Sequence, residues 1–285
     1  NLLLFIPMLV AQEFNENKFW DYSGAFMSFC LASSSVYIFN DILDVDSDRK
    51  HNIKKNRPIA LGTISQSVGA AMVPLFFFAA LAIAILIDPW FAATIISYFI
   101  FSSIYSIYLK KKPAIDICIL SWLYLLRVLA GGIATDIDVS TWLLGFSIFF
   151  FLSLASIKRL AELTEMSEKS SQLLAGRGYN SSDRSILSQI AISSGFVSVL
   201  IVALYTNSPS MANLYRFEPA IWSVCLIILF WISRTTILAN RGLIKKDPVL
   251  FVLTDYVSSI CLILVFILTF IATSIPISRT ILGLE

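Results

Sequence analysis

The feature that most limits how this chain can fold is a series of apolar runs, each close to twenty residues long. Twenty residues of helix are about 30 Å long, which matches the hydrocarbon thickness of a bilayer. Hydrophobic residues make up 57% of the 285 residues and charged residues only 14%, far below the roughly 25% of soluble domains. No segment shows the apolar–polar alternation of a half-buried strand. The sequence therefore predicts an all-α, polytopic membrane protein and excludes a soluble globular one.

The apolar runs define nine predicted spans. They cover residues 2–13, 22–40, 66–87, 90–109, 115–134, 140–157, 186–206, 219–238 and 252–274. Turn-forming residues such as Asp88-Pro89 and Asn207-Ser208-Pro209 separate them. We expect residues 1–285 to form a single transmembrane catalytic domain. Because Asn1 stands in the middle of an apolar run, with no Met or basic segment before it, we also expect the natural chain to begin upstream.

The basic residues predict how the spans are oriented. Of the 21 Lys and Arg, 17 lie in or beside the loops that follow even-numbered spans. By the positive-inside rule these loops face the cytoplasm. The two long ones, 40–65 and 158–185, follow the second and sixth spans, and this weak repetition suggests two related halves.

The cysteines and the net charge indicate little about partners. Cys30, Cys118, Cys225 and Cys261 stand singly in apolar segments, so neither a zinc site nor a disulfide framework is indicated. A net charge of +2, without a basic nucleic-acid-binding motif, predicts no nucleic-acid partner. A homo-oligomer is compatible with the sequence, although no segment of it indicates one.

An acid-rich segment directly follows the second span, with four acids within eight residues. On a helix, Asn40, Asp41, Asp44 and Asp48 share an arc about 100° wide, whereas Asp46 points the other way. Three carboxylates on one face repel each other, and a hard divalent cation such as Mg²⁺ relieves the repulsion. The alternative is a solvated helix end whose acids only keep the loop in water. Composition alone gives these two interpretations equal weight.

A basic segment completes the same loop. It contains Arg49, Lys50, His51, Lys54, Lys55 and Arg57, followed by Pro58-Ile59-Ala60-Leu61-Gly62. Acids that hold a metal, followed by Lys and Arg that bind phosphate oxygens, suit a metal–diphosphate ligand. These bases are also expected to act as a positive-inside anchor. His51, the only histidine, is explained as well by solvation as by a phosphate contact.

A second polar cluster ends the sixth span. On a continuing helix Lys158, Glu162 and Glu165 share one face, with Arg159 about 60° from Glu162. Taken alone, this pattern favours a simple Lys–Glu pair at a helix end. Further along the chain, Gly176-Arg177-Gly178-Tyr179 adds a guanidinium and a phenol.

Arg127 and Asp255 are charged residues inside predicted spans, where a charge costs a few kcal/mol and is expected to face the bundle interior or a wet cavity. Arg127 lies eleven residues past Asp116, about 16 Å deeper along the same helix. An anionic lipid headgroup is its predicted partner, and a carboxylate from another span is the alternative. Asp255 stands near the start of the last span.

The acid-rich residues carry a family resemblance. Asn40, Asp41, Asp44 and Asp48 match the NDxxDxxxD motif of the UbiA superfamily of intramembrane prenyltransferases, which this chain resembles. The longer string from Asn40 to Gly62 is similar to one branch, the decaprenyl-phosphate phosphoribosyltransferases. Aromatic prenyltransferases of the superfamily carry a second DxxxD motif, where this chain has Lys158-Arg159-x-x-Glu162. The fold implied is a nine-helix bundle with its active site under cytoplasmic loops.

The resemblance implies a Mg²⁺-dependent transferase of the bacterial inner membrane that takes part in cell envelope biosynthesis, with Mn²⁺ as an alternative metal. It would move 5-phosphoribose from 5-phosphoribosyl diphosphate to a polyprenyl phosphate, on the cytoplasmic side of the lipid bilayer. The expected catalytic residues are Asp41, Asp44 and Asp48, which together with Asn40 are the expected metal ligands. The expected donor-binding residues are Lys54, Arg57, Tyr105, Lys110, Asp116, Lys158, Arg159, Glu162, Arg177, Tyr179 and Asp255. Lys55 and Arg127 are expected to bind the acceptor phosphate.

Two other functions compete with this interpretation. A prenyltransferase with an aromatic acceptor shares the first motif but should show the second DxxxD. A transporter or channel should place polar residues through the full membrane depth, whereas here they gather on the cytoplasmic side. The chain shows no Ser/His/Asp set, and a lipid phosphate, already anionic at neutral pH, requires no strong general base.

Overall fold

The computed structural model describes residues 1–12, 16–49, 54–167, 177–209, 211, 215, 217–244 and 248–274. These residues form helices and connecting turns, with no strand element among them. In this described part of the chain, eight helices are long and apolar enough to cross a membrane, so the expected all-α, polytopic class is confirmed. The predicted first span, 2–13, is shorter than expected in the described chain, where the apolar helical segment is Leu2–Ala11.

The described chain divides into two compact units. The N-terminal unit contains η1 (Leu2–Phe5), α1 (Ile6–Ala11), α2 (Glu16–Leu43), α3 (Val45–Arg49), η2 (Lys54–Asn56), α4 (Pro58–Leu61), α5 (Gln66–Ile87), α6 (Pro89–Ile107), η3 (Leu109–Lys111) and α7 (Ile115–Ala134). The C-terminal unit contains α8 (Thr141–Ser167), η4 (Ser181–Asp183), α9 (Arg184–Tyr205), α11 (Glu218–Asn240), α12 (Pro248–Thr254) and α13 (Tyr256–Ser274). Arg177 and Gly178, which follow α8 in sequence, belong to the N-terminal unit.

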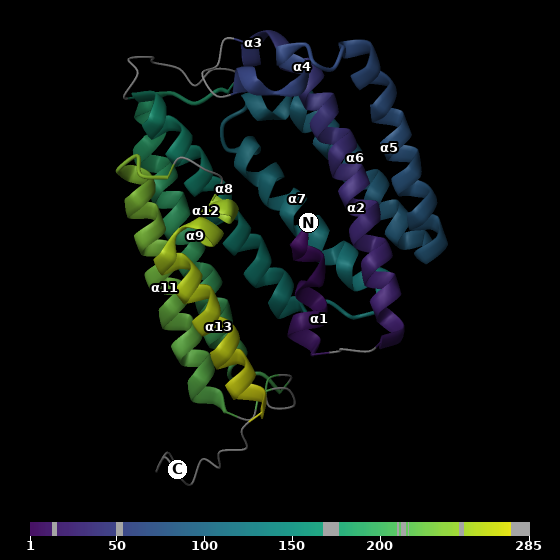
Figure 1. Ribbon diagram of the computed structural model, residues 1–285. Coiled ribbons are helices and arrows are strands. Elements are labelled where there is room, and N and C mark those ends of the chain that lie inside the picture. The colour runs from purple at the N-terminus through teal and green to yellow at the C-terminus, as the bar shows by residue number, and fades with distance from the viewer. Residues whose placement is uncertain are drawn as a thin grey trace, which may run out of the picture. The chain divides into compact units, whose positions relative to one another are not determined.

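The same order of helix packing occurs in both units. In the first, α2 packs on α5 and α6, α5 on α6, and α6 on α7; in the second, α8 packs on α9 and α11, α9 on α11, and α11 on α13. The helices α2, α5, α6 and α7 are drawn in purple to teal in Figure 1. This parallel supports the two related halves that the sequence suggests.

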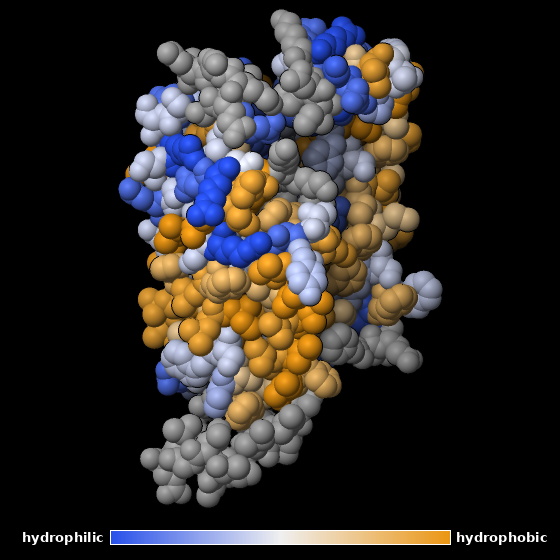
Figure 2. All heavy atoms as spheres, turned by 60° about the vertical axis from the view of Figure 1, so that its left-hand side comes forward, coloured by the Kyte–Doolittle hydropathy of each residue, from blue (hydrophilic) through white to orange (hydrophobic). Residues whose placement is uncertain are grey.

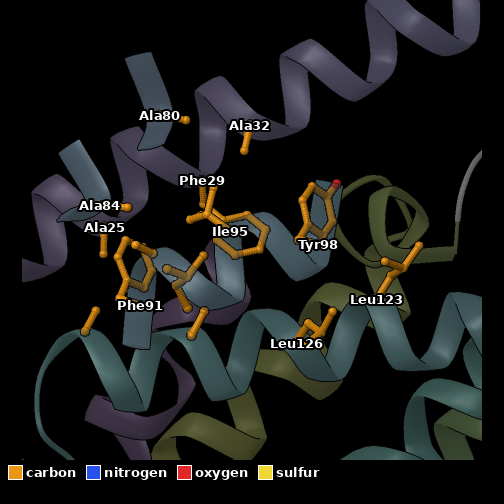
Figure 3. Packing of buried hydrophobic residues seen from close by; sticks show 14 of the residues in the cluster. Ala25, Phe29, Ala32, Ala80, Ala84, Phe91, Ile95, Tyr98, Leu123 and Leu126 are labelled. Carbon is orange, nitrogen blue, oxygen red and sulfur yellow. The ribbon is translucent and has the colours of Figure 1, made fainter. Parts of the chain in front are cut away.

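Small and aromatic side chains fill the core of the N-terminal unit. Alanines of α2 and α5 let these helices approach closely, and Phe29, Phe91, Ile95 and Tyr98 fill the space that remains (Figure 3). Hydroxyl groups add direct bonds between the two helices: Oγ of Ser28 donates to the carbonyl of Ala80 at 2.8 Å. Small residues and interhelical hydrogen bonds are the usual basis of helix association in membranes.

The outward faces of the spans are hydrophobic. The spans on α5 and α13 are the least buried of the eight, and they expose residues such as Leu75, Phe78, Ile263 and Phe270. Figure 2 shows a broad hydrophobic zone on one face, with hydrophilic residues gathered toward one end of it. Such a surface suits contact with lipid. The chain is therefore a multi-pass membrane protein.

Candidate active site

The acid-rich segment lies where α2 passes into α3, at one end of the N-terminal unit (Figure 1). Helical hydrogen bonds continue through the junction: the amide of Asp44 donates to the carbonyl of Asn40 at 2.9 Å, and that of Asp48 to the carbonyl of Asp44 at 2.8 Å. The spacing i, i+4, i+8 therefore keeps these three residues on one face. Asp46 is exposed, whereas Asp48 is only 3% exposed.

Two of the carboxylates share one guanidinium. Nη1 of Arg57 donates to Oδ1 of Asp41 and to Oδ2 of Asp48, each at 2.8 Å. Arg57 has extended backbone just before α4, and Gly62 ends that helix with a φ of 81°. The residue before a proline favours extended backbone, and glycine readily adopts positive φ. The Arg-Pro-Ile-Ala-x-Gly sequence thus forms a short turn that directs Arg57 toward the acids.

Lys110 binds the other half of the acid face. Its Nζ donates to Oδ1 and Oδ2 of Asp44 at 2.7 and 2.9 Å, and it lies 3.4 Å from Oδ1 of Asn40. Lys110 is located in η3 and is 8% exposed. Lysine is rarely this buried unless it is paired, and here the carboxylate supplies the opposite charge. Each of the three predicted metal-binding carboxylates therefore contacts a basic side chain.

A second cluster of predicted donor-binding residues lies at the start of α7. Asp116 is fully buried, and its Oδ1 accepts hydrogen bonds from the hydroxyl of Tyr105 at 2.8 Å and from Nη1 of Arg177 at 3.0 Å. The same Nη1 also donates to the Tyr105 hydroxyl at 2.7 Å. The fold of the N-terminal unit thus brings together residues of α6, α7 and the segment after α8.

The acid face fits a hard divalent cation in its chemistry. Three carboxylates and one carboxamide supply oxygen ligands, which Mg²⁺ prefers. Asp41 and Asp48 already meet at one positively charged group, so they can also meet at a metal ion. Within the described ranges no three Asp, Glu, His or Cys side chains are placed to hold a metal as they stand, and Arg57 and Lys110 are bound to the carboxylates instead.

The remaining predicted residues of the basic loop and of α8 are placed as follows. Lys54 and Lys55 are exposed in η2, while Lys50 and His51 lie outside the described residues. In the C-terminal unit, Lys158 is partly exposed, Arg159 is fully buried and donates to Oε2 of Glu162, and Tyr179 is buried. Their predicted role in donor binding stays a prediction.

Arg127, the predicted acceptor-phosphate contact inside a span, donates hydrogen bonds to neighbouring oxygen atoms and lies against aromatic rings. It donates to the hydroxyl of Tyr98 at 3.0 Å, to the carbonyl of Leu123 and to Oδ1 of Asn1. Its guanidinium also lies 4.9 Å from the ring centroid of Tyr98 and 5.6 Å from that of Phe29. Its position in α7 places it about 16 Å along the helix from Asp116, and its predicted role as an acceptor-phosphate contact stays a prediction.

Asp255 forms an ion pair whose partner the sequence analysis missed. It lies in the break between α12 and α13, outside the apolar span that starts at Tyr256. Its two oxygens accept from Arg234 at 2.6 and 3.0 Å, and its Oδ2 also accepts from the amide and hydroxyl of Ser258. The hydrogen bonds from Arg234 lower the pKa of Asp255 from 3.8 to about 2. The sequence does contain a signal for this pair. Arg234 stands inside one predicted span, and Asp255 stands 21 residues later, near the start of the next predicted span.

This pair should stabilise the fold. Arg234→Ala leaves a half-buried carboxylate without its counter-ion, a change that should cost less than the roughly 3–5 kcal/mol of a fully buried pair. We expect the melting temperature in detergent to fall by about 5–10 °C, and Arg241→Ala, at the exposed end of the same helix, to have little effect. Because the folded-state pKa lies below the ordinary value, the stabilisation is complete above pH ~4 and is lost as the pH falls toward 2. Equal losses in both variants would contradict a specific pair.

The sequence of the chain matches the model of a known protein family. This model, described as the UbiA prenyltransferase family, matches residues 2–162. Nodulation protein NoeC of Azorhizobium caulinodans is 35% identical to this chain over 92% of it and 86% of that protein. Decaprenyl-phosphate phosphoribosyltransferase of Mycolicibacterium smegmatis is 40% identical over 50% of this chain and 44% of its own length.

Solved structures resemble the whole chain. A UbiA homolog from Archaeoglobus fulgidus, bound to GPP and Mg²⁺, superimposes with a TM-score of 0.71 over 96% of this chain and 95% of that one, at 18% identity. The same homolog bound to DMAPP and Mg²⁺ gives a TM-score of 0.70 over 94% of each chain, at 17% identity. At this level of identity the likeness shows the fold.

Proposed function

Because the chain belongs to the UbiA prenyltransferase family and is a membrane transferase, we propose that it transfers 5-phosphoribose from 5-phosphoribosyl diphosphate to a polyprenyl phosphate. The observation that carries this proposal is the acid face with two bases bound to it, Arg57 and Lys110, since this set offers groups for both a metal and a diphosphate. Relatives named decaprenyl-phosphate phosphoribosyltransferase match 50–57% of this chain at 34–40% identity.

The acid face would hold the metal, with Asn40, Asp41, Asp44 and Asp48 as ligands. When bound, Mg²⁺ would neutralise the diphosphate and make it a better leaving group. The solved UbiA homolog bound to Mg²⁺ supports this choice of metal, and Mn²⁺, with similar oxygen ligands, is the proposed substitute.

Arg57 and Lys110 would then bind phosphate oxygens of the donor. Both are charge-assisted donors, and both now bind the carboxylates that the metal would take. The C1–O bond between ribose and diphosphate breaks with its electron pair leaving on the diphosphate, and an oxygen of the lipid phosphate forms the new bond to C1. The nucleophile carries its negative charge already, so catalysis would consist of positioning and electrostatic stabilisation.

The proposed site would face the cytoplasm, since the positive-inside rule assigns the loops that follow even-numbered spans to that side. In a bacterium the membrane is then the inner one. The acceptor's isoprenoid chain would lie in the bilayer, with Lys55 and Arg127 as the proposed contacts of its phosphate.

Prenyl transfer to an aromatic acceptor is the second candidate, favoured by the fold shared with a homolog that binds GPP. A turnover assay in detergent distinguishes the two. The protein is incubated with a polyprenyl phosphate and labelled 5-phosphoribosyl diphosphate, or with an aromatic acid and a labelled prenyl diphosphate. Product formation only in the first mixture supports the proposal, and product only in the second replaces it with prenyl transfer.

Recognition of the donor's 5-phosphate provides the sharper test. We expect Lys158→Ala to raise the KM for 5-phosphoribosyl diphosphate by roughly ten- to a hundredfold, since a lost charge-assisted contact is worth about 1.5–3 kcal/mol. With a ribosyl diphosphate that lacks the 5-phosphate, wild type and Lys158→Ala should have equal KM values.

The same comparison applies to Arg159 and Arg177, the other predicted donor contacts of this cluster, which each bind a carboxylate within the protein. Arg159→Ala and Arg177→Ala should raise the KM for 5-phosphoribosyl diphosphate but match the wild type with the donor that lacks the 5-phosphate, and a loss of the same factor with both donors would show a purely structural role. A loss in Lys158→Ala that is also the same with both donors would show that Lys158 does not read the 5-phosphate.

A further inference from the structure

Gly178 packs against the backbone of the turn that joins η3 to α7. A methyl group on its Cα would lie 2.2 Å from the carbonyl oxygen of Lys111 and 2.8 Å from Cδ of Pro113. Distances below 3.0 Å are essentially never seen for real Cβ atoms. Since a main-chain carbonyl and a proline ring cannot rotate away as a flexible side chain can, only glycine fits at this position.

The surface that Gly178 meets is held by its own hydrogen bonds. The amide of Ile115 donates to the carbonyl of Pro113 at 2.8 Å, and that of Asp116 to the carbonyl of Lys112 at 3.0 Å. Ala114, between them, has a φ of 63°, a conformation that a residue with a side chain seldom adopts. The turn that Gly178 contacts therefore leads directly into Asp116.

The neighbouring residue, Arg177, is bound to that aspartate. The Asp116 carboxylate is fully buried, and 19% of the Arg177 side chain is exposed. A buried carboxylate needs an opposite charge, and removing its partner is costly. The hydroxyl of Tyr105 donates to the Asp116 carboxylate and accepts from Arg177, so residues of α6 and α7 meet Arg177 at one point.

We propose that Gly178 is a positioning residue. Because Gly178 lacks a side chain, Arg177 and Gly178 can pack against the Lys111–Ala114 turn, and this docking seats Arg177 as the counter-ion of Asp116. The turn also begins directly after Lys110, which binds Asp44, so the docking fixes the base that contacts the acid face. This inference goes beyond the proposed function, and its main test requires no substrate.

The test is a double-variant cycle read by melting temperature in detergent. We expect Arg177→Ala and Gly178→Ala each to lower the melting temperature by about 5–10 °C. The double variant should fall no further than the worse single variant, because both changes break one contact. Gly145→Ala is the matched control: its added methyl would meet Ile201 at 3.5 and 3.8 Å, an ordinary contact, and should change the melting temperature little. Additive losses, or an unaffected Gly178→Ala, would overturn the proposal.

A second substitution, Asp116→Asn, removes the buried charge. It distinguishes loss of the Arg177 ion pair from general damage to the turn. An uncharged carboxamide in place of the buried carboxylate would need no counter-ion, so Asp116→Asn should restore at least about half of the loss in both Arg177→Ala and Gly178→Ala. If Gly178→Ala does not accumulate in the membrane, accumulation of the Asp116→Asn/Gly178→Ala protein supports the proposal, and its absence contradicts it.

Activity provides a second, separable measurement. In the donor assay, Arg177→Ala, Gly178→Ala and the double variant should lose the same factor in kcat/KM. If the wild-type protein transfers neither phosphoribose nor a prenyl group, the proposed function fails, whereas the melting temperatures still decide the role of Gly178.

Discussion

Asp48→Asn is expected to reduce turnover by at least about a hundredfold, because it removes the charge of a proposed metal ligand. The Asp48 carboxylate is almost completely buried and shares Arg57 with Asp41. Asn keeps the size and one oxygen of the side chain but can no longer neutralise a cation. Asp44→Asn should have an effect of the same size, since Asp44 is bound by Lys110 on the same helix face.

Asp46→Asn is the matched control for this result. Asp46 lies in α3, two residues before Asp48, but it is exposed. The same chemical change at this position should alter turnover only mildly. Melting temperatures of all three variants would separate loss of catalysis from loss of folding. Similar losses of turnover at positions 46 and 48 would contradict a site built on one helix face.

Much of the fold could be predicted because the bilayer restricts it. An apolar run of about twenty residues has few alternatives to a spanning helix, and runs such as 66–87 and 115–134 agree with α5 and α7 within a residue. The prediction was less accurate where a short segment or an internal break decides the structure. The first predicted span is a shorter helical segment, and Asp255 separates α12 from α13 within the predicted span 252–274.

The acid face could be predicted because it is local. The spacing of Asn40, Asp44 and Asp48 places them on one face of any helix, and the structure shows a helical path through them. Their basic partners depend on contacts far apart in the sequence. Lys110 is separated from Asp44 by 66 residues, and no spacing rule connects such positions.

The contact between Arg177 and Asp116 shows the same limit. The sequence predicts both as donor-binding residues, but it does not indicate that they bind each other across 61 residues. The need for glycine at 178 arises only from the main-chain carbonyl of Lys111 beside it. Glycine in a loop is usually explained by flexibility, so its packing role becomes visible only in three dimensions.

Removal of divalent metal should abolish turnover and leave the protein folded. EDTA would take away the ion that neutralises the donor diphosphate, and adding Mg²⁺ or Mn²⁺ in excess should restore the activity. We expect the melting temperature to change by less than about 2 °C on chelation, because each of the three carboxylates is paired with Arg57 or Lys110 when no metal is present.

Loss of turnover without loss of folding differs from the behaviour of a structural metal site. There the binding energy of the metal is folding energy, so a chelator unfolds the protein. Arg57→Ala sharpens the distinction. Without this guanidinium two of the carboxylates lose their shared cation, so the variant should melt at a lower temperature in EDTA than in Mg²⁺, whereas the wild type should not. Full turnover of a metal-free preparation would exclude the proposed mechanism, and a large loss of wild-type stability in EDTA would show that the two bases do not neutralise the acid face.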